Sequence, residues 1–178
     1  METAYLGGGC FWCVEAVFDK VRGVESAVSG YMGGTAADAN YEAVCSKATD
    51  HVEIVAVRFD PDEISYADVL GIFFSVHDPT TLNRQGNDVG PQYRSVIFTA
   101  DDAQAATART VLAQAATHYD DPIVTAIEPA QTFYKAEDYH QGYFDRVGAR
   151  NSYCTYVISP KVNKFRQQFA ERLKPAAA

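Results

Sequence analysis

Two cysteines stand close together near the start of the chain, in the stretch YLGGGCFWC. Cys10 and Cys13 are separated by an aromatic pair, and three glycines precede Cys10. An apolar run with helical spacing follows, so the glycines place Cys10 between a strand and the start of a helix. There, unpaired N–H groups and the helix dipole favour an anion and lower a thiol's pKa below its ordinary value of about 8.5. The pattern predicts a reactive thiolate at Cys10.

Four other kinds of site fit this stretch to different degrees. A phosphate-binding loop would need a Lys-Ser/Thr ending or GxGxxG spacing, which the sequence does not have. A zinc site needs four ligands, and neither a second CxxC nor a His-x(3-5)-His completes the set, so we expect no metal. A buried, inert thiol is the usual fate of a lone cysteine. A thioredoxin-like dithiol fits the CxxC spacing best and is the main rival.

A carboxyl group in the clearest predicted strand is the second chemical candidate. In HVEIVAVRF, residues 51–59, Glu53 shares a strand face with Val55, Val57 and Phe59. A carboxyl on an apolar face has a raised pKa, which a general acid near neutral pH requires. The alternative is that Glu53 lies at the strand end and reaches water. The pattern leaves both possibilities open.

Alternating hydrophobic periods predict the elements that position these groups. Strands and helices in mixed order favour an α+β fold, a two-layer α/β sandwich with a mixed, mainly antiparallel sheet. Residues 77–93 lack any period, and their amides favour a binding loop. The tail at 175–178 is expected to be frayed. The predicted strands end at Leu6 and span 23–34, 51–60 and 94–99. The predicted helices span 14–23, 65–77 and 101–119, and the last two of these are capped by Ser65 and Asp101. A final helix has Ser159 as its N-cap and Pro160 at N1, and its core-facing residues are Val162, Phe165, Phe169 and Leu173.

The composition limits the range of partners. The chain has 178 residues, 47% of them hydrophobic and 21% charged, which suits one globular domain over 1–178. A net charge of -8 disfavours nucleic acid and anionic membranes as partners. The start shows neither a signal peptide nor a membrane span, so we expect a cytoplasmic protein whose four cysteines rest as thiols.

Five separated blocks of the sequence resemble the peptide methionine sulfoxide reductase A family. They are GGCFWCVEAVF, GYMGG, YEAVCSKATDHVE, HDPTTLNRQGNDVGPQYRS and AEDYHQGYF. The resemblance runs in order over nearly the whole chain and implies that family's ferredoxin-like two-layer sandwich. It also implies a reductase for the S epimer of methionine sulfoxide, in proteins or free. We expect a monomer without metal or organic cofactor.

The resemblance also implies a role for individual side chains. Cys10 is the nucleophile that becomes a sulfenic acid, and Glu53 is the proton donor, assisted by the hydroxyls of Tyr41 and Tyr143. The substrate-binding residues that the resemblance implies are Phe11 and Trp12, as an apolar wall for the substrate methyl group, and Asp138, as a polar contact.

A second thiol is needed to resolve the sulfenic acid into a disulfide that thioredoxin then reduces. Many family members place this thiol near the C-terminus, and Cys154, on a connection expected to move, is the matching candidate. Cys13 stands where the family frequently has glycine, but its disulfide with Cys10 would close a short, strained loop. We therefore favour Cys154 over Cys13. Asp50 and Val52 also depart from the family pattern and leave the fine positioning of the acid open.

Other polar residues near these blocks are expected to be structural. We read Glu15 as a first-turn carboxylate, His140 as a structural histidine, Tyr139 as a packing residue and Cys45 as a bystander. Two other function classes stay open. One is a general CxxC thiol-disulfide oxidoreductase, and the other is a non-enzymatic protein that binds oxidised peptides through residues 77–93.

Overall fold

The computed structural model describes residues 1–175, so most of the tail that we expected to be frayed lies outside the described residues. A six-stranded sheet forms the centre, with strand order β7-β6-β1-β3-β2-β8, and only the β6–β7 pair is parallel. The strands of this sheet are β1 (Glu2–Gly7), β2 (Val24–Met32), β3 (Val52–Phe59), β6 (Val96–Thr99), β7 (Ala126–Pro129) and β8 (Tyr134–Lys135).

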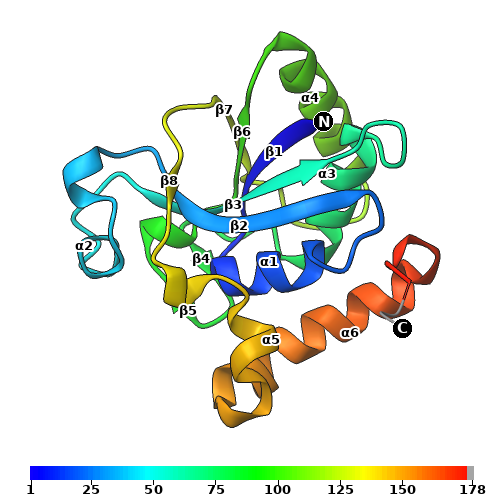
Figure 1. Cartoon of the computed structure of the whole chain (residues 1–178). Coiled ribbons are helices and arrows are strands. Elements are labelled where there is room, and N and C mark those ends of the chain that lie inside the picture. Colours follow the sequence, from blue (N-terminus) through cyan, green and yellow to red (C-terminus); the bar gives the residue numbers. More distant parts are fainter. Residues whose placement is uncertain (176–178) are drawn as a thin grey trace.

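The helices complete a β1-α1-β2-β3-α3-β6 core, which is the ferredoxin-like order of elements. The predicted two-layer, mainly antiparallel α+β fold is confirmed. Figure 1 shows α1 alongside β2 and β3, with α6 beyond it. The helices are α1 (Phe11–Phe18), α2 (Tyr41–Cys45), α3 (Tyr66–Val76), α4 (Asp102–Ala116), α5 (Tyr143–Val147) and α6 (Ser159–Gln168).

Strand β3 separates two hydrophobic clusters because its side chains alternate between the faces of the sheet. Val55, Val57 and Phe59 belong to the large core beneath the helices. Val52 and Ile54 belong to a smaller cluster on the other face. This alternation turns Glu53 toward the helical side, as the sequence pattern predicted.

The predicted starts of two helices are confirmed by their caps. The Ser65 hydroxyl accepts the backbone N–H of Asp68 at 3.0 Å, at the start of α3. The Asp101 carboxylate accepts the backbone N–H of Gln104 at 2.8 Å, at the start of α4. These side chains satisfy N–H groups that the first helical turn leaves free.

The predicted start of the last helix is wrong. Ser159 has helical backbone angles, and its hydroxyl donates to the carbonyl of Cys154 at 2.9 Å. A π-helical turn, Cys154–Ile158, runs directly into α6, so the helical path begins before the predicted N-cap. Val162 and Phe165 are buried as predicted, whereas Phe169 and Leu173 lie past the end of α6 and are half-buried.

The elements that the sequence did not predict are all short. Residues 77–93 contain a hairpin of β4 (Arg84–Gln85) and β5 (Asp88–Val89), and β7, β8, α2 and α5 have five residues or fewer. Segments of this length carry too few side chains to show a hydrophobic period. Within residues 1–175, no helix combines the length and apolarity that a membrane crossing requires.

Candidate active site

The glycines before Cys10 are needed for a tight passage between β1 and α1. Gly9 has φ +91°, and a Cβ there would lie 2.6 Å from the side chain of Gln85. A Cβ on Gly8 would lie 2.8 Å from the ring of Phe73. Cys10 follows as the N-cap residue of α1, where the sequence placed it, and it is buried.

Glu53 meets the same helix end from β3. The Cys10 side chain caps no N–H of α1, and the backbone N–H of Phe11 donates instead to Glu53 Oε2 at 3.1 Å. The carboxyl group is buried, which excludes the alternative that it reaches water at the strand end. Burial raises the pKa of Glu53 to about 8, although the Phe11 hydrogen bond opposes the rise. Glu53 is therefore largely a neutral acid at neutral pH.

The two thiols of the CxxC stretch influence each other at the start of α1. Cys10 is the N-cap residue and Cys13 is at N3. A hydrogen bond from the Cys10 thiol lowers the pKa of Cys13 to about 7. The pKa of Cys10 is raised well above its ordinary value by burial, by this hydrogen bond and by the nearby charges of Cys13 and Glu53. The predicted lowering at Cys10 is wrong for the substrate-free protein, and the thiol with the lowered pKa is Cys13.

A tyrosine and an aspartate complete the surroundings of Cys13, and sequence reasoning missed both. The Tyr153 hydroxyl oxygen lies 3.8 Å from Cys13 Sγ. The same hydroxyl donates to Asp88 Oδ2 at 2.5 Å. Asp88 belongs to β5, so residues 77–93 reach the cysteine pair, whereas no local sequence signal pointed to Tyr153.

The aromatic residues after Cys10 have different surroundings. Phe11 is fully buried and packs against Tyr31 and His140. Trp12 is half-buried and stacks on Tyr143, with ring centroids 3.9 Å apart and planes 7° apart. The Tyr143 hydroxyl accepts a hydrogen bond from the side chain of Asn151 at 2.9 Å. The ring of Tyr143 extends the apolar wall beside Trp12, and the role of its hydroxyl in proton transfer stays a prediction.

Two other tyrosines lie close to the reacting groups. Burial raises the pKa of Tyr41, and so do its hydrogen bond with Cys45 and the charges of Glu53 and Cys10. Burial and the charges of Glu53 and Cys10 also raise the pKa of Tyr93. The hydroxyl of Tyr41 is thus near the site, as predicted, and Tyr93 joins it. Cys45 has the Tyr41 hydroxyl beside it, but burial raises the pKa of this thiol, so it is not activated, as its prediction as a bystander expects.

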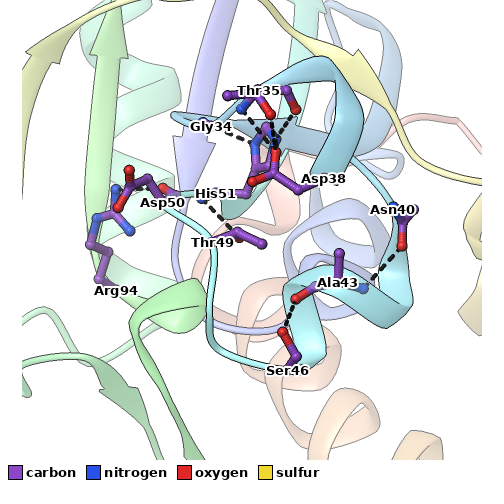
Figure 2. A network of polar contacts seen from close by, with 10 residues as sticks. All are labelled: Gly34, Thr35, Asp38, Asn40, Ala43, Ser46, Thr49, Asp50, His51 and Arg94. Atoms are coloured by element: carbon purple, nitrogen blue, oxygen red, sulfur yellow. Dashed lines mark hydrogen bonds and ion pairs between the residues drawn. The ribbon is translucent and has the colours of Figure 1, made fainter.

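A polar network holds the loop that carries Tyr41 (Figure 2). The buried His51 ring accepts the backbone N–H of Gly34 at 3.2 Å through Nδ1. Its Nε2 lies 2.8 Å from the carbonyl oxygen of Thr35 and 3.2 Å from Asp38 Oδ1. These contacts join residues 34–38 to the residue just before β3, and so fix the loop beside the strand that carries Glu53.

The two departures before Glu53 leave the acid in place. Asp50 enters this network through its backbone carbonyl, which accepts from Arg94 at 3.3 Å, and its side chain is exposed. Val52 is buried in the small cluster on the opposite face of β3. Neither side chain takes the position of Glu53.

The segment 136–143 differs from the prediction at three residues. The Asp138 side chain is 97% exposed and pairs with Lys135 at 3.4 Å, so the structure does not bring it to Cys10. Tyr139 is largely exposed and does not pack in the core. His140 is buried, and Nδ1 accepts the indole N–H of Trp12 at 3.0 Å, but Nε2 has no hydrogen-bond partner among residues 1–175.

Glu137 makes the contacts that bind this segment to the site. Its Oε1 accepts the Tyr31 hydroxyl at 3.1 Å, and its Oε2 accepts the backbone N–H of Tyr41 at 3.1 Å. The carboxylate thereby ties residues 136–143 to the first residue of α2. The resemblance implied the neighbouring Asp138, and the contacts of Glu137 depend on an orientation that only the folded chain shows.

The prediction that Cys154 lies on an irregular connection is wrong. Its side chain is 0% exposed and opens the π-helical turn before α6. Burial raises the pKa of Cys154, and the charge of nearby Cys13 adds to the rise. Cys13 is therefore the thiol whose hydrogen bond and charge act on Cys10, whereas Cys154 only feels the charge of Cys13.

Comparison with the sequences and solved structures of other proteins assigns this chain to a known family. Residues 2–173 match the family model described as peptide methionine sulfoxide reductase. The peptide methionine sulfoxide reductase MsrA of Polynucleobacter asymbioticus is 52% identical over 100% of this chain and 94% of its own length. The chain belongs to the peptide methionine sulfoxide reductase family.

Two solved structures of a more distant member agree with the fold. The reduced form of Mxr1 from Saccharomyces cerevisiae is 32% identical, covers 86% of this chain and 88% of its own, and has a TM-score of 0.79. Mxr1 in complex with Trx2 is 26% identical, covers 80% of this chain and 84% of its own, and has a TM-score of 0.56. The likeness supports the reductase fold and supplies a family member with a bound redox partner.

Proposed function

We propose that the protein reduces the S epimer of methionine sulfoxide to methionine, with Cys10 as the acceptor of the oxygen. The observation that carries the proposal is the meeting of Cys10 and Glu53 at one helix end. Sulfoxide reduction needs a nucleophile at sulfur and a proton at the departing oxygen, and these two residues supply them. The net step converts the sulfoxide and the Cys10 thiol into a thioether and a Cys10 sulfenic acid.

The protonation of the two groups suits this step. The Cys10 sulfur bonds to the sulfoxide sulfur while Glu53 protonates the oxygen. The S–O bond of the substrate and the transient S–S bond to Cys10 then break as the oxygen bonds to the Cys10 sulfur, which releases the thioether. The proton that Cys10 gives up balances the one that Glu53 donates. A neutral Glu53 places no negative charge beside the sulfur as it ionises. A thiolate from a thiol of raised pKa is also intrinsically the stronger nucleophile.

The aromatic wall supplies the substrate contact. The half-buried Trp12, stacked on Tyr143, offers an apolar surface next to Cys10 for the substrate methyl group. Tyr41 and Tyr93 bring hydroxyl groups close to Glu53, where they can hold the sulfoxide oxygen. The positions of the oxygen and the methyl group are then both specified, which selects one epimer of a chiral sulfoxide.

Cys13 is the resolving thiol in this proposal. It attacks the Cys10 sulfenic acid, the S–S bond forms, and the oxygen leaves as water with the proton of Cys13. With a pKa of about 7 in the dithiol form, Cys13 is substantially ionised at neutral pH before Cys10 is oxidised. This choice replaces the sequence-based preference for Cys154, which depended on a mobility that a buried helical residue does not have.

Thioredoxin returns the enzyme to its dithiol form. The thioredoxin thiols reduce the disulfide by exchange and leave as a disulfide themselves. The complex of Mxr1 with Trx2 supports this choice of electron donor. The proposal also includes a cytoplasmic monomer, one catalytic domain over 1–178, substrates that are free or within proteins, and no metal or organic cofactor.

The experiment that tests the function follows both epimers separately. Thioredoxin, thioredoxin reductase and NADPH are supplied with free or peptide-bound methionine sulfoxide of R or S configuration. The proposal predicts that the S epimer is converted to methionine and that the R epimer is left. Conversion of neither epimer, together with reduction of a disulfide substrate such as insulin, would instead favour a general thiol-disulfide oxidoreductase. Binding of the peptide without any methionine would favour a non-enzymatic binder.

A further inference from the structure

The Tyr153 hydroxyl has a position that the proposed first step does not use. It lies 3.8 Å from Cys13 Sγ and donates to Asp88 Oδ2 at 2.5 Å. Tyr153 precedes the π-helical turn, and Asp88 belongs to β5, so three distant parts of the chain converge at this oxygen. Burial raises the pKa of Tyr153, which keeps its proton in place as a hydrogen-bond donor.

The hydrogen bonds to Cys13 change when Cys10 is oxidised. In the dithiol form, the Cys10 thiol donates to Cys13 and is the largest cause of the lowered pKa of Cys13. Formation of the sulfenic acid consumes that S–H group. Cys13 must ionise after this event, since it attacks only as a thiolate. Apart from the O–H of the sulfenic acid itself, the Tyr153 hydroxyl is then the side-chain donor that residues 1–175 place beside its sulfur.

We propose that Tyr153 is a catalytic residue of the resolving step, which donates a hydrogen bond to the Cys13 thiolate, and that Asp88 competes for the same proton. The inference rests on the proposed function, in which Cys13 resolves the sulfenic acid. During the step, the Cys13–Cys10 S–S bond forms, the S–O bond of Cys10 breaks, and water leaves with the proton that Cys13 released. Tyr153 keeps its proton and changes its hydrogen-bond acceptor from Asp88 to the Cys13 thiolate.

The charges around Cys13 determine the sign of each substitution. Lys161 of α6 favours the thiolate, and Asp88 opposes it. Glu53 and Cys154 also feel the charge of Cys13, so they oppose a second negative charge when they are ionised. Removal of the Tyr153 hydroxyl therefore disfavours the thiolate. Neutralisation of Asp88 favours it twice, because a negative charge disappears and the Tyr153 proton becomes available.

The test measures the lifetime of the Cys10 sulfenic acid. Reduced protein receives one equivalent of a methionine S-sulfoxide peptide, and dimedone traps the sulfenic acid at increasing delays for mass spectrometry. We expect Tyr153→Phe to prolong its lifetime by about tenfold, the loss of one charge-assisted hydrogen bond, and Asp88→Asn to shorten it. Tyr156→Phe is the matched control, because Tyr156 lies in the same turn and is 79% exposed. It should match the unmodified protein.

The opposite signs separate a chemical role from a structural one. Tyr153→Phe removes the link between β5 and the turn and Asp88→Asn weakens it, so a purely structural link predicts the same direction for both. Changes in the same direction, or lifetimes equal to that of Tyr156→Phe, would overturn the role of Tyr153. Methionine released by the unmodified protein in the same samples tests the proposed function independently. Its absence would defeat that function, whatever the sulfenic acid lifetimes show.

Discussion

Two buried carboxyl groups, Glu53 of β3 at the start of helix α1 and Glu15 within α1, have different uses. Glu53 accepts the backbone N–H of Phe11 at 3.1 Å, and Glu15 accepts that of Gly142 at 3.0 Å. Each is 2% exposed, and burial raises the pKa of Glu53 to about 8 and that of Glu15 to about 7. A raised pKa therefore reports burial and does not by itself identify a catalytic acid.

The neighbours of the two groups make the difference. Glu53 lies beside the sulfur of Cys10, where a proton is needed during the reaction. Glu15 lies near Asp19 and Asp145 and binds the start of α5, which carries Tyr143. Its expected role as a first-turn carboxylate is replaced by a link between two helices. We infer that one end of α1 performs the chemistry and that the next turn positions the aromatic wall.

The largest expected effect belongs to Glu53. Glu53→Gln removes the acidic proton with little change of shape, so the rate of the first methionine formation should fall by about 100-fold to 10,000-fold. Glu15→Gln is the matched control, because it changes an equally buried acid on the other side of α1. Rapid quenching measures both rates. Equal losses in the two variants would erase the distinction between them.

Glu53→Gln should also change the free energy of unfolding, and the burial of the carboxyl group determines the direction of that change. The folded pKa of Glu53, about 8, lies above its ordinary 4.5, so the folded protein holds the proton more tightly than the unfolded chain does. The contribution of Glu53 to the free energy of unfolding is therefore fully present below pH 4.5 and declines as the pH rises toward 8. At pH 7 the cost is about 3 kcal/mol. Urea unfolding should show a stabilisation of Glu53→Gln that grows between pH 5 and 8, and a difference independent of pH would contradict the buried acid.

Substitution of Cys13 gives a second test of the chemistry proposed at the start of α1. Cys13→Ser should still yield methionine in the first turnover, but its steady-state rate with thioredoxin should fall by at least about tenfold, because the sulfenic acid is not resolved. Cys154→Ser is the control and should retain more activity. If Cys154→Ser is the variant that stops turnover, the original sequence-based preference is correct and our assignment of Cys13 is not.

Substitutions of Glu15 and Tyr143, which position the aromatic wall, should affect activity less than substitutions of Glu53 and Cys13. Glu15→Ala releases the Gly142 N–H and loosens α5, so the KM for a sulfoxide peptide should rise by about fivefold with a lesser change in kcat. Tyr143→Phe keeps the ring that stacks on Trp12 and should change KM by less than about twofold. A large loss of kcat in Tyr143→Phe would contradict this expectation and support the predicted role of its hydroxyl in proton transfer.

Local patterns in the sequence were enough to place both reacting groups. The glycines placed Cys10 at a helix start, and alternation along β3 turned Glu53 inward. The pKa of Cys10 was not predictable, because its burial and the contact with Cys13 depend on packing. Tyr153 and Asp88 are 65 residues apart and meet only in the folded chain. The burial of Cys154 was missed because a π-helical turn extends α6 backward past its proline.

The central claim is that the oxygen of the substrate passes to the sulfur of Cys10. The most direct measurement gives fully reduced protein an excess of a methionine S-sulfoxide peptide without any reductant, counts the methionine formed, and maps the cysteines by mass spectrometry. We predict about one methionine per chain, a disulfide between Cys10 and Cys13, and no methionine from Cys10→Ser. Methionine produced by Cys10→Ser at the rate of the unmodified protein would contradict the account.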